Sequence, residues 1–168
     1  MDRIVIKRVQ VLSALEQWNS TYSTGQLTVA QVMTAAPSCI GAEVNAFELV
    51  RMFHAKHFRH LLVTDSQGCL LGVVSDRDVI RCFAPGESPD KQRLTQITAG
   101  ELMSTDVVTI EPQATLNKAV ALMLQEGISC LPVVAERTLL GILTNTDLHV
   151  VLQTLLASPA SMVPAEAD

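Results

Sequence analysis

The chain contains two copies of one sequence pattern, and this repeat constrains the fold more than any other feature. Residues 26–34 (QLTVAQVMT) align with residues 96–104 (QITAGELMS) at an offset of 70, and every position is identical or similar in kind. The register continues without a gap to residues 61–63 over 131–133, after which a one-residue deletion in a turn changes the offset to 69. A single loop deletion in an otherwise continuous register indicates duplication, so we expect two homologous halves.

Each half begins with the signals for a short helix and a short strand. Thr28-x-x-Gln31 and Thr98-x-x-Glu101 form capping boxes, which are typical of helix N-termini. The leading strands are expected near residues 38–40 and 107–110. A longer amphipathic helix follows, for which Asn45 or Thr115 is the natural N-cap. Its apolar positions, at i, i+3, i+4, i+7 spacing, are Ala46, Leu49, Val50 and Phe53 in the first half and Leu116, Ala119, Val120 and Met123 in the second.

Two strands joined by a turn and a final helix complete each half. The strands are expected at residues 60–64 and 70–75, and at 130–135 and 139–144. The final helix begins at Asp76 or Asn145, and the first copy ends early, at Ala84-Pro85-Gly86. The second copy places Leu148, Val151, Leu152 and Leu155 at helical spacing. The predicted fold class is therefore α+β, with two β-α-β-β-α halves.

These signals divide the chain into five segments. They are an N-terminal extension (1–25), a first domain (26–83), a linker (84–95), a second domain (96–156) and a C-terminal tail (157–168). The linker is rich in Pro, Gly, Ser and charge, and the tail is expected to be disordered. In the extension, Val11, Leu15 and Trp18 can share one face of a helix that docks on the halves or on a partner.

The composition excludes several classes of protein. A net charge of −5 argues against nucleic acid as a main partner, because binding to phosphates needs clustered Lys and Arg. The four cysteines show no CxxC spacing and are expected to be reduced core thiols. The N-terminus lacks the apolar stretch of a signal peptide, and no segment has the roughly 20 apolar residues of a membrane span. We therefore expect a cytoplasmic protein with no membrane insertion.

The motifs of the two halves resemble a known family. The first half carries VMT (32–34), RHLLV (59–63) and GVVSDRD (72–78), and the second carries ELMS (101–104), CLPVV (130–134) and GILTNTD (141–147). In order and spacing, found twice, they resemble a pair of cystathionine β-synthase (CBS) domains over residues 26 to about 156. The resemblance implies a pseudo-two-fold module packed through two three-stranded sheets, with clefts that bind adenosine-containing ligands. It also implies a free-standing module that forms a homodimer.

Two equivalent motifs carry the candidate chemistry. Ser75 to Asp78 and Thr144 to Asp147 each follow an apolar strand and open a helix. As [ST]-x-x-D sequences, they are explained by helix capping alone. The same geometry also suits a ligand, because a helix N-terminus attracts phosphate and a carboxylate can accept hydrogen bonds from two ribose hydroxyls. The family uses these positions for ribose and phosphate.

Basic side chains are unevenly distributed between the halves. Arg59, His60 and Arg77 are candidate phosphate partners, or alternatively solvated surface residues, whereas their counterparts Ser129, Cys130 and Thr146 are not basic. The two ligand sites are therefore expected to differ in affinity for charged ligands. The full set of candidate nucleotide-binding residues is Thr34, Arg59, His60, Ser75, Arg77, Asp78, Ser104, Thr144, Asn145, Thr146 and Asp147.

The leading functional hypothesis is a regulatory module that senses an adenosine nucleotide, such as AMP or ATP, and modulates a protein partner or its own assembly. The alternative is a dimerisation or scaffold module with no ligand. No Ser-His-Asp order, Walker loop or GxGxxG sequence supports an enzyme, so no catalytic residue and no further cofactor are predicted. His54, His57 and His60 lack a carboxylate or cysteine nearby, and no metal site is predicted.

Overall fold

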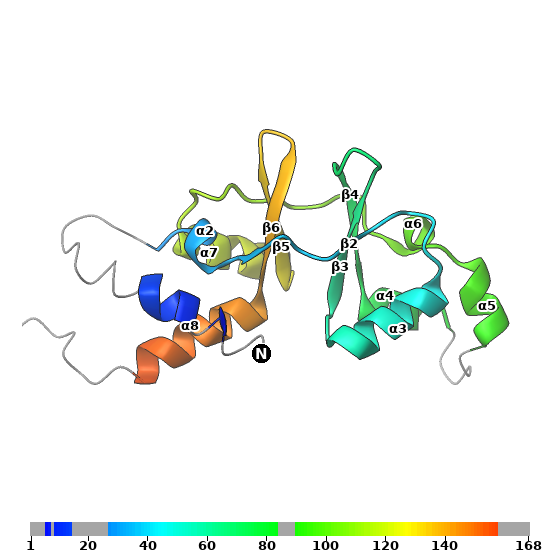
Figure 1. The fold of residues 1–168 in the computed structure, drawn as a ribbon, viewed down its shortest axis with the longest axis horizontal. Coiled ribbons are helices and arrows are strands. Elements are labelled where there is room, and N and C mark those ends of the chain that lie inside the picture. The colour runs from blue at the N-terminus through cyan, green and yellow to red at the C-terminus, as the bar shows by residue number, and fades with distance from the viewer. Residues whose placement is uncertain (1–5, 8, 15–26, 84–89, 158–168) are drawn as a thin grey trace, which may run out of the picture. The chain divides into compact units, whose positions relative to one another are not determined.

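The computed structural model describes residues 6–7, 9–14, 27–83 and 90–157 (Figure 1). It contains two three-stranded sheets together with helices, which confirms the predicted α+β class. The chain divides into two compact units, each assembled from separate stretches of sequence. Unit 1 comprises Met1–Ala35, Glu111–Leu131 and Ile142–Asp168, and unit 2 comprises Ala36–Ile110 and Pro132–Gly141.

Unit 2 is organised around a sheet with strand order β2-β3-β4. Strand β2 pairs parallel with β3, and β3 pairs antiparallel with β4, so that His60 lies opposite Ser75 in the ladder. The bounds of β3, β4 and the start of α4 are as predicted. The elements are β2 (Cys39–Ile40), α3 (Ala46–Lys56), β3 (His60–Thr64), β4 (Leu70–Ser75), α4 (Asp76–Arg81), α5 (Lys91–Gln96) and α6 (Ala99–Leu102).

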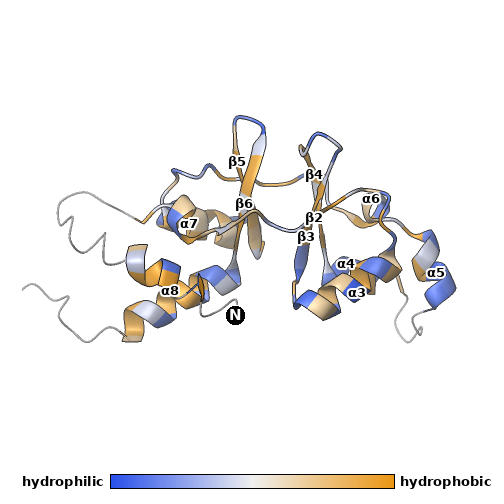
Figure 2. Ribbon diagram, viewed as in Figure 1, coloured by the Kyte–Doolittle hydropathy of each residue, from blue (hydrophilic) through white to orange (hydrophobic). Residues whose placement is uncertain are grey.

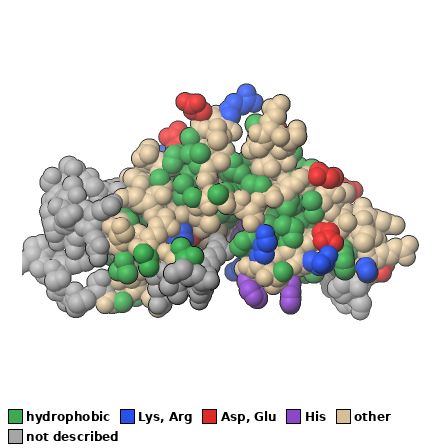
Figure 3. Space-filling model, viewed as in Figure 1, with side chains coloured by type: hydrophobic (Ala, Val, Ile, Leu, Met, Phe, Trp, Pro, Cys, Tyr) green, Lys and Arg blue, Asp and Glu red, His purple; other side chains and the backbone are tan. Residues whose placement is uncertain are grey.

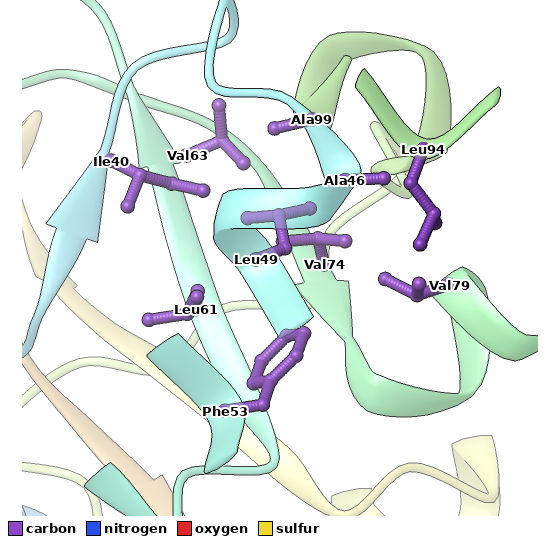
Figure 4. Close-up of a cluster of buried hydrophobic side chains, with 10 residues drawn as sticks. All are labelled: Ile40, Ala46, Leu49, Phe53, Leu61, Val63, Val74, Val79, Leu94 and Ala99. Atoms are coloured by element: carbon purple, nitrogen blue, oxygen red, sulfur yellow. The ribbon is translucent and has the colours of Figure 1, made fainter. Parts of the chain in front are cut away.

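Helix α3 packs its apolar face onto this sheet. As predicted, Asn45 is the N-cap, and its Oδ1 accepts the backbone N–H of Glu48 at 3.0 Å. The helix ends where His57 adopts a left-handed conformation with φ of 52°. The prediction for Val50 was wrong, because this side chain is exposed. The core beneath α3 consists of Ile40, Ala46, Leu49, Phe53, Leu61, Val63, Val74, Val79, Leu94 and Ala99 (Figure 4).

Helix α5 begins in the stretch that the sequence suggests is a linker (84–95) and ends one residue beyond it. Asp90 caps it by accepting the N–H groups of Gln92 and Arg93 at 3.1 and 3.4 Å. Leu94 is buried in the core of unit 2. The capping aspartate and the buried leucine stabilise this short helix, and the Pro, Gly and Ser residues that indicate a linker all precede it in the sequence.

The second sheet has strand order β1-β6-β5. Strand β6 begins one residue earlier than predicted. The expected strand at residues 107–110 is reduced to a single parallel bridge between Ile110 and Val133. The remaining elements are α2 (Val29–Val32), β1 (Thr34–Ala35), α7 (Leu116–Glu126), β5 (Cys130–Ala135), β6 (Thr138–Thr144) and α8 (Asn145–Ala157). The predicted cap of α7 is confirmed, since Thr115 Oγ1 accepts the Lys118 N–H at 3.2 Å.

The opening segment of each repeat lies against the other repeat. In unit 1, the N–H of Val29 donates to Ala114 O at 2.9 Å, and the N–H of Leu116 donates to Leu27 O at 2.7 Å. In unit 2, the N–H of Ala99 donates to Val44 O at 2.7 Å in the equivalent arrangement. Each compact unit therefore combines the opening helix of one repeat with the body of the other, an exchange that the repeat pattern does not predict.

Of the four apolar positions at helical spacing in α8, only Val151 is among the buried residues of the helix. Its buried residues are Asp147, Val150, Val151 and Thr154. Leu152, Leu155 and Leu156 are exposed, Leu156 to 77%. The helix is hydrophobic along most of its length (Figure 2), and hydrophobic side chains reach the surface near its end (Figure 3). The exposed leucines form an apolar surface on unit 1.

Part of the N-terminal extension is helical and packs into unit 1. Residues 6–7 and 9–14, here called the N-terminal segment, lie beside α8 (Figure 1). Val11, predicted to lie on the packing face, is 1% exposed, and Ala14 is also buried. Leu15 and Trp18, which were expected on the same face, lie outside the described residues. So does the predicted disordered tail, apart from Ala157 at the end of α8.

Candidate functional site

The first candidate aspartate, Asp78, lies in the first turn of α4 with one carboxylate oxygen committed to the backbone. Its Oδ2 accepts the Ser75 N–H at 2.7 Å and the Ser75 hydroxyl at 2.6 Å, forming a capping box. Its Oδ1 lies 3.5 Å from Nη1 of Arg81, whose side chain is largely exposed. The side chain of Asp78 is 19% exposed. The cap therefore fixes the carboxylate and leaves Oδ1 near solvent.

The predicted basic residues gather around this aspartate. The strand register places His60 opposite Ser75. Arg59 Nε lies 3.8 Å from Asp76 Oδ2, and the Asp76 N–H donates to Arg59 O at 3.2 Å. Arg77 is exposed on the first turn of α4. These residues, with Asp78 and Ser104, make up the Asp78 site.

Ser104 reaches the Asp78 site from the other repeat. Its backbone forms two hydrogen bonds, of 2.9 and 3.1 Å, with the backbone of Val73. Val73 is two residues before Ser75 in strand β4. Gly72 makes this approach possible, because a Cβ there would lie 2.6 Å from Met103 Sδ and 2.8 Å from the Ser104 carbonyl oxygen. The Ser104 side chain is exposed. The site therefore combines residues from both repeats.

The second candidate aspartate, Asp147, repeats the capping geometry in unit 1. Its Oδ2 accepts the N–H and the hydroxyl of Thr144, both at 2.7 Å. The hydroxyl of Thr34, in the opening segment of the first repeat, donates to Oδ1 at 3.3 Å. Asn145 and Thr146 are exposed on the first turn of α8. These residues form the Asp147 site, which is the counterpart of the Asp78 site.

Lys7, which the sequence reasoning did not single out, belongs to the Asp147 site. Its Nζ lies 3.0 Å from Asp147 Oδ1 and donates to the Val32 carbonyl oxygen at 2.6 Å. Asp147 is only 2% exposed, and Lys7 is also buried. Lys7 is one helical turn before Val11, so the two side chains lie on the same face of a helix. The spacing could therefore have predicted that Lys7 lies on the packing face with Val11.

The two sites also differ in a pair of equivalent titratable side chains. Burial lowers the pKa of His60 from its ordinary value of 6.5, against the opposing influence of Asp76. Its counterpart Cys130 is buried among apolar residues, which raises the pKa of the thiol to about 12. The Asp78 site can therefore gain a proton at His60 only as the pH falls below about 6.5, whereas Cys130 stays neutral.

Comparison with known proteins places this geometry in a family. The CBS domain matches the chain twice, at residues 29–85 and 99–153. The chain belongs to the CBS domain family. The tandem pair expected from the motifs is thereby confirmed, because both matches lie on the repeats, and Asp78 and Asp147 occupy equivalent positions within them.

Several relatives share most of this CBS pair. An uncharacterized protein of Methanopyrus kandleri is 28% identical over 81% of the chain. A crystal structure assigned to the acetoin utilization protein AcuB of Vibrio cholerae superposes with a TM-score of 0.69, at 31% identity, covering 79% of this chain and 94% of that one. The crystal structure of CBSX2 in complex with AMP has a TM-score of 0.63 at 26% identity and covers 76% of this chain and 97% of that one.

The chain spans only part of the first curated relatives. It covers 65% of the Methanopyrus kandleri protein and 27% of a homoserine O-acetyltransferase from Methanocorpusculum labreanum, to which it is 32% identical. CBS pairs thus occur within larger enzymes as well as in shorter proteins. Among the described residues, no helix is both long and apolar enough to cross a membrane.

Proposed function

We propose that this CBS pair is a non-catalytic regulatory module that binds an adenosine nucleotide and modulates a protein partner or its own assembly. The observation that carries the proposal is the Asp78 carboxylate. Its Oδ2 is fixed by Ser75, while Oδ1 lies 3.5 Å from Nη1 of the exposed Arg81 side chain. An immobilised carboxylate with an accessible oxygen suits the vicinal hydroxyls of a ribose.

The charges around Asp78 support a phosphorylated ligand. Arg59 and Arg77 are exposed cations beside the N-terminal end of α4, and His60 lies on the adjoining strand. Guanidinium groups bind phosphate through paired, charge-assisted hydrogen bonds. The relative CBSX2 was crystallised with AMP. AMP is therefore the first ligand to test, and ATP is the second, because its additional phosphates require more positive charge.

Titration calorimetry of the whole chain with AMP tests the role of Asp78. Asp78→Asn preserves the shape of the side chain and removes its charge. Loss of a charge-assisted hydrogen bond costs about 1.5–3 kcal/mol, so we expect affinity to fall by about ten- to a hundredfold. Asp90→Asn is the matched control, because Asp90 also caps a helix in unit 2 and Asn is an equally good cap.

Two results would overturn the nucleotide proposal. If Asp78→Asn binds AMP as tightly as the wild type, Asp78 is a helix cap and nothing more. If the wild type binds neither AMP nor ATP at millimolar concentration, the scaffold alternative becomes the better account. Circular dichroism melting of each variant establishes that a loss of affinity does not come from unfolding.

A homodimer is part of the proposal, and the exposed leucines of α8 support it. Leu152, Leu155 and Leu156 present an apolar surface that association would remove from water. Leu156→Asp is expected to shift sedimentation from dimer toward monomer. Leu124→Asp, on the exposed side of α7, provides a control of equal exposure. A wild type that sediments only as a monomer at tens of micromolar contradicts the dimer.

A further inference from the structure

The two aspartates have the same cap but different partners on their second carboxylate oxygen. Oδ1 of Asp78 lies 3.5 Å from the exposed guanidinium of Arg81. Oδ1 of Asp147 lies 3.0 Å from Lys7 Nζ and 3.3 Å from the Thr34 hydroxyl. The oxygen that is accessible in one site is thus enclosed by protein donors in the other.

Lys7 is held at Asp147 by more than the ion pair. Its Nζ also donates to Val32 O at 2.6 Å, and Gln10 Nε2 donates to Gln31 O at 2.9 Å. Val11, one helical turn after Lys7, is also buried in unit 1. Polar and apolar contacts therefore both hold the N-terminal segment against the rest of unit 1.

We infer that the N-terminal segment closes the Asp147 site, with Lys7 occupying the position that a ligand hydroxyl would take, while the Asp78 site stays open. The inference rests on the proposed nucleotide-binding function. Its physical basis is competition, since Lys7 and Thr34 already use both acceptor positions of Asp147 Oδ1 and leave none for a ribose hydroxyl. A ligand can enter the Asp147 site only when the segment undocks, so segment docking and ligand binding oppose each other.

A different role for Lys7 predicts the opposite change in ligand affinity when Lys7 is replaced. The counterparts of the basic residues around Asp78 are uncharged in the Asp147 site, so Lys7 brings positive charge to it, and the alternative role for Lys7 is to bind phosphate. Its ammonium group, however, is buried and bonded to Asp147 and to a backbone carbonyl. A phosphate-binding lysine is needed for binding, and its removal weakens affinity. A closing lysine prevents binding, and its removal strengthens affinity.

The experiment measures AMP affinity by titration calorimetry in the Asp78→Asn background, where the open site is weakened. Lys7→Met and, separately, Val11→Asp are added to this background. Both substitutions are expected to release the N-terminal segment. Lys7→Met removes the ion pair with Asp147, and Val11→Asp places a charge at a buried apolar position. Each is expected to strengthen AMP binding by about tenfold or more, because the fraction of competent Asp147 sites rises. Val9→Asp is the matched control, since Val9 lies on the exposed side of the same segment.

A second measurement follows the segment directly. Hydrogen exchange of the amides in residues 9–14 is expected to accelerate in Lys7→Met and in Val11→Asp, and to stay unchanged in Val9→Asp. The gain in AMP affinity should disappear when Asp147→Asn is added to Lys7→Met and Asp78→Asn. Melting curves identify any variant that fails to fold, and the two releasing variants act through different contacts.

The possible outcomes separate this inference from the proposed function. If Asp78→Asn weakens AMP binding but neither releasing variant restores it, the closed site is wrong and the proposed function stands. Weaker binding in Lys7→Met shows that Lys7 binds the ligand, which also overturns the closed site. If the wild type and every variant fail to bind AMP or ATP, the proposed function fails and the closed site fails with it.

Discussion

Asp78 and Asp147 occupy equivalent positions in the two repeats, yet their environments are opposite. Both accept the N–H and hydroxyl of the residue that precedes their helix, at 2.6–2.7 Å. Asp78 is 19% exposed, and Asp147 is 2% exposed beside Lys7. The local motif therefore sets the orientation of each carboxylate. A segment far away in the sequence determines whether its second oxygen is available.

Burial explains why the two aspartates need different partners. An ionised carboxylate that leaves water must be paired and hydrogen-bonded, because its desolvation is costly. Lys7 and Thr34 supply these partners to Asp147, whereas Asp78 retains access to water. The repeats also differ in charge around the two aspartates. Arg59 and Arg77 lie near the accessible Asp78, whereas the equivalent positions near the buried Asp147 are Ser129 and Thr146.

The largest difference between the two sites is expected in how much each aspartate stabilises the fold. Asp147→Ala removes the partner of buried Lys7 and the cap of α8, and we expect it to lower the free energy of unfolding by about 3 kcal/mol. Asp78→Ala removes a cap near solvent, and we expect a loss of about 1 kcal/mol. Urea denaturation of both variants measures the difference. Equal losses would contradict the structural role assigned to Asp147.

A smaller difference is expected between the hydroxyls contributed by the opening segments. Thr34→Val removes a donor to buried Asp147 without changing the shape of the side chain, at a cost of about 1 kcal/mol. Ser104→Ala leaves the two backbone bonds to Val73 intact and should change stability by less than about 0.5 kcal/mol. Denaturation midpoints compare the two variants. A larger loss for Ser104→Ala would reverse the assignment of which site is closed.

The smallest effect is a pH dependence confined to the Asp78 site. Because burial lowers the pKa of His60, the unfolded chain binds this proton more readily than the folded chain. Stability contributed by neutral His60 is complete above about pH 6.5 and is lost as the pH falls below that value. His60→Gln should therefore reduce the drop in melting temperature between about pH 7.5 and about pH 5.5.

Cys130→Ala is the control for that pH measurement. Burial raises the pKa of Cys130 to about 12, so its thiol remains neutral throughout the range. The variant can lower the melting temperature, but the pH-dependent part of the curve should match that of the wild type. An unchanged pH slope in His60→Gln would show that His60 does not distinguish the two sites.

The sequence predicted the elements and motifs that depend on local signals. The strands at His60–Thr64 and Cys130–Ala135 follow from short apolar runs next to turns, and the caps Asn45 and Thr115 follow from capping chemistry within each repeat. The family resemblance followed from the same motifs, and the two domain matches confirm it. Local patterns succeed where neighbouring residues supply the decisive contacts.

The remaining features depend on contacts between distant residues. Thr34 reaches Asp147 across 113 positions, and the exchange of opening segments cannot be read from a pattern that repeats in register. Helix α5 was missed because the Pro, Gly and Ser residues just before it indicate a linker, although Leu94 is buried. Val50 was expected on the packing face of α3 and is exposed, since helical spacing alone does not say which apolar stripe meets the core.

A crystal structure of the protein grown with saturating AMP tests the central comparison most directly. The account predicts AMP in the Asp78 site, with its ribose hydroxyls within hydrogen-bonding distance of the Asp78 carboxylate and Lys7 still paired with Asp147. AMP bound at Asp147 while Lys7 remains in place would contradict the closed site. An Asp78 site that stays empty at saturating AMP would contradict the nucleotide-binding function itself.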